Sequence, residues 1–109
     1  MTIPHKETAL EFLQHADAAA KEIGAVNTIV FAPEGAVGYN TDYRAAMDCL
    51  TEGIAKIHPG PEPFQGVGAL ILGAGGVSRA IGYGLVRRGA SVMISSRTLE
   101  RSEALAAAI

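Results

Sequence analysis

The chain has little of several residue types that mark particular classes of protein. Its 109 residues include one cysteine, Cys49, and no tryptophan. A single cysteine excludes a disulfide framework within the chain and fits a reducing, cytoplasmic compartment. Cys49 falls in a predicted amphipathic helix, which favours a buried structural thiol over a nucleophile.

The chain also has little net charge and no long apolar run. The net charge at pH 7 is −2 and the basic residues form no long run, so we predict neither nucleic-acid nor membrane-surface binding. No apolar run approaches the length of a membrane-spanning helix, and Pro4, His5, Lys6 and Glu7 are untypical of a signal peptide. We also predict no metal site.

Glycine is abundant, and it centres the clearest motif of the chain, Gly73-Ala74-Gly75-Gly76. The apolar run at 69–72 before this motif predicts a strand buried on both faces of a parallel sheet. A helical pattern follows and ends near Arg87-Arg88-Gly89, and a second apolar run at 92–94 stops at Ser95. Strand, glycine turn, helix and strand in this order are typical of the βαβ unit that holds a dinucleotide.

The glycines have specific tasks in that interpretation. Gly73 allows a tight turn out of the strand, and Gly75 lets backbone N–H groups approach a pyrophosphate at the N-terminus of the helix. The third position of the usual G-x-G-x-x-G pattern is Ser78, which is small but not glycine. The predicted phosphate-binding turn comprises Gly73, Ala74, Gly75, Gly76, Val77 and Ser78. The alternative is a plain glycine turn in some other α/β protein.

The residues after the second strand indicate which cofactor the unit would take. An NAD site usually carries an acid there, whereas this chain has Ser95, Ser96, Arg97, Thr98 and then Arg101. If a helix begins at Thr98, the two arginines converge near its N-terminus. A guanidinium pair with the hydroxyls of Ser96 and Thr98 suits a 2′-phosphate, so we favour NADP. The alternative is a solvated helix start capped by one of the hydroxyls.

The first half of the chain is predicted to form a helix, a hairpin and a second helix. The helix is predicted from Glu7 to Gly24, and strands at 25–31 and 37–40 flank a turn at Pro33-Glu34-Gly35. Asp42 is expected to cap the next helix. The proline-rich segment 58–63 is a linker, or a loop that leads into the nucleotide-binding unit. We therefore divide the chain into domains at 1–62 and 63–109.

Three polar residues of the first half need an explanation. An ammonium such as Lys6 can donate a proton to a developing alkoxide while a carboxylate such as Asp42 orients it. The amide of Asn27 can fix a substrate hydroxyl. Each residue also has a simpler interpretation: a solvated lysine, a helix cap and an irregularity in a strand.

Taken together, the motifs resemble the shikimate dehydrogenase family. The resemblance covers essentially the whole chain and rests on Thr2-Ile3-Pro4-His5-Lys6, Gly24-Ala25-Val26-Asn27-Thr28, Gly38-Tyr39-Asn40-Thr41-Asp42 and Gly73-Ala74-Gly75-Gly76. Ser96-Arg97-Thr98 resembles the Asn-Arg-Thr NADP signature of the family, with Ser in place of Asn. The resemblance implies an α/β fold: the C-terminal part of a substrate-binding domain, then the first βαβα of a Rossmann-type NADP-binding domain.

The resemblance also implies roles for individual residues. Lys6 and Asp42 would form the catalytic pair, and Thr2, Asn27 and Asp42 would contact the substrate. The parent enzyme would reduce 3-dehydroshikimate to shikimate with NADPH. Tyr43 stands where many members have glycine, and its surroundings resemble dehydrogenases fused to a dehydroquinate dehydratase. A quinate dehydrogenase that uses NAD and a non-catalytic sensor on the same scaffold are the alternatives.

Family members extend beyond both ends of this sequence. We therefore expect a central fragment that is inactive alone. Its incomplete sheets would expose edges through which the fragment can self-associate.

Overall fold

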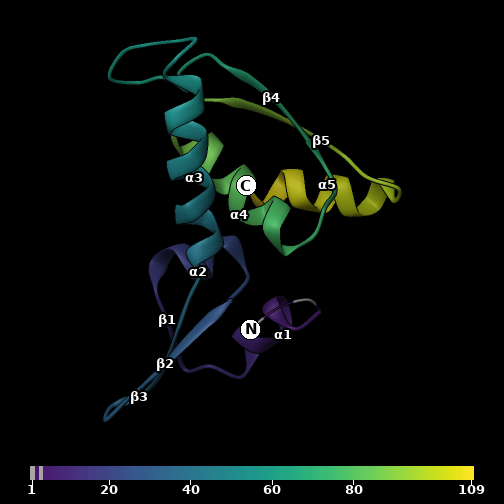
Figure 1. The fold of residues 1–109 in the computed structure, drawn as a ribbon. Helices are drawn as coiled ribbons and strands as arrows, with labels where there is room; N and C mark the ends of the chain where they lie inside the picture. The colour runs from purple at the N-terminus through teal and green to yellow at the C-terminus, as the bar shows by residue number, and fades with distance from the viewer. Residues whose placement is uncertain (1, 3) are drawn as a thin grey trace.

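The chain folds around two small sheets that one long helix connects (Figure 1). The computed structural model describes residue 2 and residues 4–109. The first sheet has the strand order β1-β3-β2, and the second consists of β4 and β5. Helix α3 (Thr41–Ile54) starts directly after the first sheet and runs toward the second.

The predicted hairpin forms the larger part of the first sheet. Strands β2 (Thr28–Ala32) and β3 (Gly35–Tyr39) pair antiparallel, with Val30 opposite Val37. A short strand, β1 (His15–Ala16), pairs parallel to the other edge of β3. The hairpin prediction is confirmed, and the parallel strand beside it was not foreseen.

The predicted single helix between Glu7 and Gly24 is wrong in its middle. The structure has α1 (Lys6–Glu11) and α2 (Ala18–Ile23), with β1 between them. Asp17 gives α2 a cap of its own, because its carboxylate accepts a hydrogen bond from the backbone N–H of Ala20 at 2.9 Å. Gly24 ends α2 in a left-handed conformation, at φ +77°.

Two expectations about α3 are also wrong. Asn40, not Asp42, caps the helix, because its side-chain oxygen accepts a hydrogen bond from the backbone N–H of Tyr43 at 3.2 Å. Asp42 lies within the first turn instead. Cys49 is exposed rather than buried, since the inner face of the helix is the one that carries the fully buried Met47.

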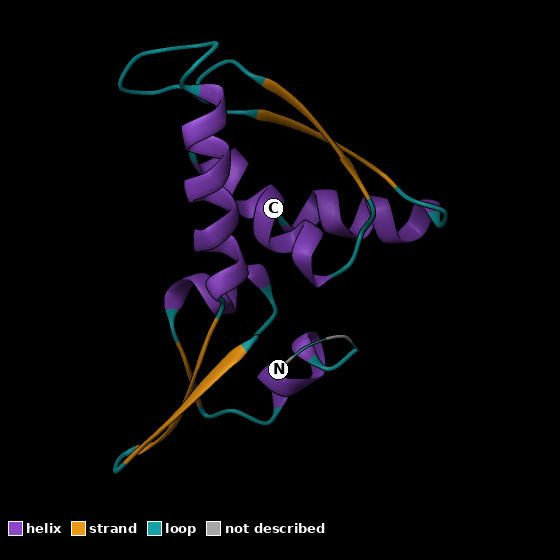
Figure 2. Cartoon of the chain, viewed as in Figure 1, coloured by secondary structure: helices purple, strands orange, loops and turns teal. Residues whose placement is uncertain are grey.

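The predicted βαβ order in the second half is confirmed. Strand β4 (Gly68–Leu72), helix α4 (Gly76–Arg87) and strand β5 (Ser91–Ser95) follow one another, and helix α5 (Leu99–Ala108) completes the unit. The two strands are parallel, with Leu70 opposite Met93. Figure 2 shows that a long loop without regular structure separates α3 from β4, in the region where the proline-rich segment was noted.

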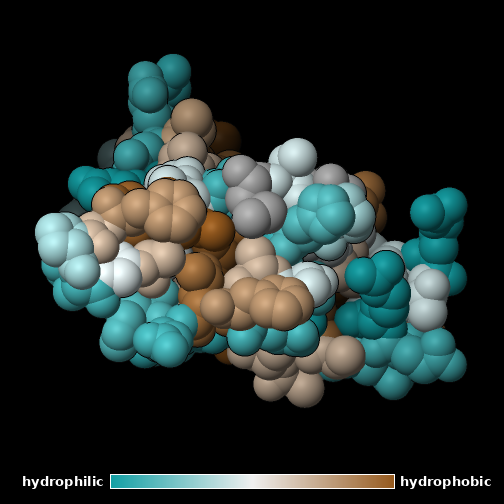
Figure 3. All heavy atoms as spheres, turned by 90° about the horizontal axis from the view of Figure 1, so that it is seen from below, coloured by the Kyte–Doolittle hydropathy of each residue, from teal (hydrophilic) through white to brown (hydrophobic). Residues whose placement is uncertain are grey.

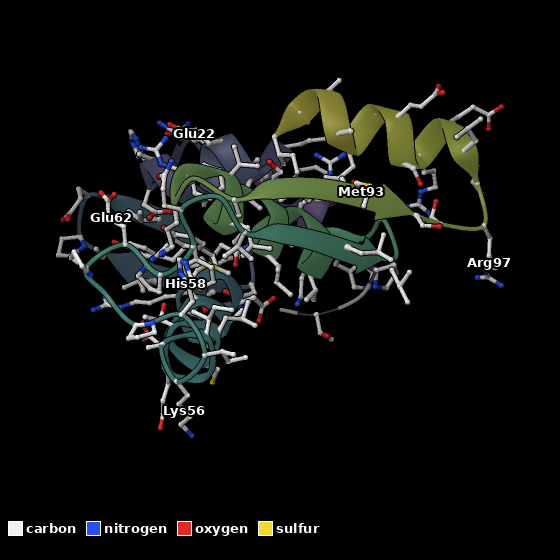
Figure 4. The ribbon with its side chains drawn as sticks, turned by 90° about the horizontal axis from the view of Figure 1, so that it is seen from above. Glu22, Lys56, His58, Glu62, Met93 and Arg97 are labelled. Carbon is white, nitrogen blue, oxygen red and sulfur yellow. The ribbon has the colours of Figure 1, made fainter. Side chains whose placement is uncertain are left out.

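The strands of this unit are buried on one face only, which corrects the prediction of two buried faces. Helices α4 and α5 contact the sheet from the same side, so Ala69 and Ile71 pack inward. The alternate side chains are exposed: Leu70 by 59%, Leu72 by 77% and Met93 by 66%. Figure 4 labels Met93 on this strand pair.

The buried core consists of two clusters. The first joins α3, α4 and the second sheet through Met47, Phe64, Leu85 and Ala90. The second joins α2 and α4 through Ile23, Ala25 and Ala80. Viewed from below, apolar atoms also reach the surface among polar ones (Figure 3). Within the part of the chain that the structure describes, no helix is long and apolar enough to cross a membrane.

Candidate functional site

A close ion pair joins Lys6 and Asp42, which lie 36 residues apart in sequence. The ammonium Nζ of Lys6 donates a hydrogen bond of 2.6 Å to Oδ2 of Asp42. The side chains are 12% and 31% exposed, so water screens this pair less than it would at an open surface. The lysine stem lies against Gly76, where an added Cβ would stand 3.8 Å from Cβ and Cδ of Lys6.

Two consecutive residues after α2 fix both partners of the pair. The backbone N–H of Val26 donates to the carbonyl oxygen of Lys6 at 2.7 Å, which holds the start of α1 in place. The carbonyl oxygen of Ala25 accepts a hydrogen bond of 3.1 Å from the buried side chain of Asn40, the cap of the helix that carries Asp42. Both residues are fully buried, so the pair rests on a rigid support.

The amide of Asn27 connects the entry of β2 to the start of α3. Its Oδ1 accepts hydrogen bonds of 2.9 Å from the backbone N–H of Thr41 and from the hydroxyl of Thr28. Its Nδ2 donates to the hydroxyl of Thr41 at 2.9 Å. Thr2 is exposed, and its carbonyl oxygen accepts from the N–H of His5 at 2.9 Å. The substrate contacts of Asn27 and Thr2 stay predictions.

The glycine turn has the backbone that the sequence required. Gly73 adopts φ +120°, which L-residues with side chains rarely reach, and its N–H donates to the carbonyl oxygen of Ser95 at 2.7 Å. Gly75 caps α4, and no atom lies within 4 Å of a Cβ built there. The turn is therefore open in front of the unpaired N–H groups at the start of a twelve-residue helix, where an anion is favoured.

The loop after β5 and the first turn of α5 place Arg97 and Arg101 on one side of this turn. Leu72, Gly73 and Ala74 form a groove of about 510 Å³ with the segment that carries Ser95, Ser96, Arg97, Thr98 and Arg101. The hydroxyl of Ser96 donates to the carbonyl oxygen of Thr98 at 2.7 Å, which shapes the loop. Thr98 precedes α5 without a capping hydrogen bond from its side chain. Figure 4 shows Arg97 projecting clear of the helices.

A second cleft, of about 600 Å³, brings the two halves of the chain together. One wall carries Lys6 and its neighbours at the start of α1. The other wall carries the turn from Gly75 to Ser78, with both arginines at its edge. The full lining is Pro4, Lys6, Glu7, Thr8, Gly75, Gly76, Val77, Ser78, Arg97 and Arg101. The amine of the ion pair and the proposed phosphate cradle therefore share one space.

One residue near this cleft was missed by the sequence reasoning. Arg79 lies in the first turn of α4, and its Nε stands 3.6 Å from Oε1 of Glu7 on α1. The Nε atom is buried and has no hydrogen-bond partner. No sequence pattern singled out this arginine, because its partner lies on a helix far away in the chain. Among the described residues, no group of three side chains is arranged to hold a metal ion.

These features define a class of protein: a mixed α/β chain in which an open glycine turn and a lysine ammonium line the same cleft. The comparison with known proteins agrees. Residues 1–29 match the family described as the shikimate dehydrogenase substrate-binding domain. The NADP⁺ shikimate dehydrogenase of Methanocella arvoryzae is 44% identical to this chain, in an alignment that covers 98% of the chain and 36% of that protein.

Two further proteins show the same relationship. The bifunctional 3-dehydroquinate dehydratase/shikimate dehydrogenase of Arabidopsis thaliana is 38% identical over 99% of this chain and 19% of its own length. A crystal structure of shikimate 5-dehydrogenase from Thermus thermophilus, in complex with NADP(H) and shikimate, superposes with a TM-score of 0.80. It is 36% identical, over 98% of this chain and 38% of that chain. This chain is therefore similar in sequence and in fold to shikimate dehydrogenases, and it spans little more than a third of the single-function relatives.

Proposed function

We propose that this chain is the central part of an NADP-dependent shikimate dehydrogenase, which reduces 3-dehydroshikimate to shikimate. The observation that carries the proposal is the shared cleft, where Lys6 faces the glycine turn and the two arginines. The relatives support the same conclusion, because they are named as NADP⁺ shikimate dehydrogenases and one was crystallised with both ligands.

In this proposal the chain contributes to two domains. Residues 1–62 belong to the substrate-binding domain and residues 63–109 to a Rossmann-type nucleotide-binding domain. The match of residues 1–29 to a substrate-binding domain supports the first assignment. The parallel βαβα order of the second half supports the other. The loop between α3 and β4 separates them, although α3 and α4 pack together across the boundary.

The residues present fit the proposed cofactor. The open turn at Gly75 would take the pyrophosphate on backbone N–H groups, and a side chain there would occupy the space that the phosphate needs. Arg97 and Arg101 would bind the 2′-phosphate, and the end of β5 carries no acid that would repel it. NADPH, when bound, supplies the hydride of the reaction.

The ion pair supplies the proton. The Lys6 ammonium donates it to the carbonyl oxygen of the substrate as that oxygen gains negative charge, which leaves a neutral amine and an alcohol. Asp42 holds the ammonium in position through the 2.6 Å hydrogen bond. Thr2 and Asn27 would orient the substrate through its hydroxyls.

The test is the initial rate of the complete protein that contains this segment, with shikimate or quinate and with NADP⁺ or NAD⁺. We expect the fastest nicotinamide reduction with shikimate and NADP⁺. Equal rates with quinate and NAD⁺ would support the quinate dehydrogenase alternative. Binding of shikimate without turnover would support the sensor.

A substitution of Lys6 tests its proposed role as the proton donor. Lys6→Ala should lower kcat by about 10²–10⁴-fold, the usual share of a general acid. Its KM for NADPH should change little, because the phosphate contacts lie on other residues. Lys21→Ala is the matched control, since Lys21 is exposed on α2. Normal turnover by the Lys6 variant would exclude this residue from the proton transfer.

A further inference from the structure

We propose that Tyr43 is a positioning residue that anchors the first turn of α3, and with it Asp42, to helix α4. This inference rests on the proposed function, since it concerns the placement of the Lys6–Asp42 pair. Tyr43 follows Asp42 directly in that turn, but the two side chains serve different neighbours. Asp42 pairs with Lys6, whereas Tyr43 packs against α4.

The ring of Tyr43 packs closely against the backbone of α4. A Cβ built at Gly84 would lie 2.7 Å from Cε2 of Tyr43 and 2.6 Å from the sulfur of Met47. Real Cβ atoms do not approach other atoms this closely, so only glycine leaves room for the two side chains of α3. The tyrosine ring therefore occupies a notch in the surface of α4, at the position where Gly84 has no side chain.

The hydroxyl end of Tyr43 is held by the end of the same helix. Nη1 of Arg88 donates a hydrogen bond of 3.1 Å to the Tyr43 hydroxyl and one of 3.2 Å to the carbonyl oxygen of Gly84. The guanidinium carbon lies 5.5 Å from the centre of the Tyr43 ring. Arg88 is the C-cap of α4, where a cation also satisfies the helix dipole.

A second tyrosine extends the anchor to α2. The ring of Tyr83 meets that of Tyr43 edge to face, at 5.2 Å between centres and 71° between planes. The guanidinium carbon of Arg87 lies 5.3 Å from the Tyr83 ring centre, and Nη1 of Arg87 pairs with Glu22 at 3.2 Å. Tyr43 thus belongs to an array of side chains that spans α2, α3 and α4.

Tyr43 is also where the two buried clusters meet. Among the described residues, it is the one partly buried side chain packed against both the Met47 cluster and the Ile23 cluster. The first turn of α3 cannot rotate without pulling this ring out of its notch. Since Asp42 is the preceding residue, the anchor fixes where its carboxylate meets Lys6.

The first experiment measures kcat and KM of Tyr43→Ala and Tyr43→Phe in the complete protein. A misplacement of about 1 Å at a catalytic group can cost up to about 10²-fold, so we expect Tyr43→Ala to lose about tenfold or more in kcat. Tyr43→Phe keeps the ring and should recover most of the rate. KM for NADPH should stay within about twofold, because the glycine turn is unchanged. Tyr39→Phe, at the exposed end of β3, is the matched control.

A double variant separates positioning from general damage to the fold. If Tyr43 acts through Asp42, Tyr43→Ala should add almost no loss of kcat in an Asp42→Asn background. The same tenfold loss in both backgrounds would overturn the proposal. So would a Tyr43→Ala enzyme with normal kcat.

A second measurement does not depend on activity. Amide hydrogen exchange of residues 43–46, followed by mass spectrometry, should speed up about tenfold in Tyr43→Ala and little in Tyr43→Phe. Unchanged exchange in Tyr43→Ala would overturn the anchor. If the unmodified protein shows no dehydrogenase activity, the proposed function fails, and the exchange rates still decide whether Tyr43 holds the turn.

Discussion

Replacing Gly84 with alanine should destabilise this protein, although the same change inside a helix usually stabilises. Alanine is the best helix former and glycine the worst ordinary one, with a difference of about 0.5–1 kcal/mol. Gly84 lies within α4 and is buried, so propensity alone would favour the substitution. The packing of α3 against α4 predicts instead that the substitution lowers the free energy of unfolding.

The magnitude follows from the atoms that the new methyl group would meet. Its carbon would lie 2.6 Å from the sulfur and 2.7 Å from Cγ of Met47, and 2.7 Å from Cε2 of Tyr43. Favourable carbon contacts need about 3.5–4.0 Å, so the overlap is close to 1 Å at each atom. Met47 is fully buried and has little room to withdraw. Overpacking of this kind costs about 1–3 kcal/mol, which leaves a net loss of up to about 2.5 kcal/mol after the gain in propensity.

Equilibrium urea unfolding of three proteins gives the test: the unmodified protein, Gly84→Ala and Gly53→Ala. Gly53 is the matched control, because it lies in α3 and no atom stands within 4 Å of a Cβ built there. Gly53→Ala should raise the free energy of unfolding by up to about 1 kcal/mol. If Gly84→Ala is as stable as Gly53→Ala, the close approach of the two helices is wrong, and the notch for Tyr43 with it.

Three other predictions concern the cofactor, pH and the isolated chain. Arg97→Ala should raise KM for NADPH about tenfold or more with little effect on KM for NADH, since a charge-assisted hydrogen bond contributes about 1.5–3 kcal/mol. Equal changes for both cofactors would contradict the 2′-phosphate assignment, and so would a similar change in the exposed control Arg44→Ala. Burial, together with a hydrogen bond to Glu22, raises the pKa of Tyr83 above its ordinary value of 10.0. The associated stability is therefore present below about pH 10 and is lost as the pH rises through the folded-state pKa. In a plot of the free energy of unfolding against pH, Tyr83→Phe should therefore fall less steeply at alkaline pH than the unmodified protein. Superimposable curves would show that the pKa shift is absent. The 109-residue chain alone should not produce NADPH from shikimate and NADP⁺, because its single-function relatives are nearly three times as long and hydride transfer needs the reacting atoms about 3–3.5 Å apart. Steady production of NADPH would refute this prediction.

Local signals explain why the second half was predictable from the sequence. The apolar runs at 69–72 and 92–94 and the glycines between them each specify backbone conformation without help from distant residues. Gly73 indeed adopts a left-handed φ, and Gly89 does so after α4, at φ +89°. The helix between them ends at Arg87, where the basic pair indicated its end.

Long-range packing explains the errors. The apolar spacing of Leu10, Leu13, Ala16 and Ala20 continues a helical period across a segment that is not helical, because residues 15–16 pair with β3 instead. The periodicity of a strand likewise does not reveal whether helices cover one face or two. Leu70 and Met93 are exposed for that reason.

In the candidate site, too, the sequence indicated the residues with local motifs but not those placed by long-range packing. Residue types and motifs singled out Lys6, Asp42, the glycine turn and Arg97, and the structure places Lys6, the turn and Arg97 around one cleft, with Asp42 paired to Lys6. No sequence pattern indicated that Arg79 lies beside Glu7, since the two are on helices far apart in the chain. The roles of the cleft residues in binding and catalysis are still predictions.

The separation of Lys6 and Asp42 along the chain has a consequence for the order of folding. Bringing together two residues 36 positions apart costs about 3 kcal/mol of loop-closure entropy. A 2.6 Å contact between flexible side chains cannot repay that cost before the surrounding helices pack. The pair should therefore form late, after the burial of the apolar cluster around Met47 and Leu85 has brought α3 and α4 together. In partly folded chains the lysine and the carboxylate stay separately hydrated, so the ability to transfer a proton should appear only in molecules that have completed folding.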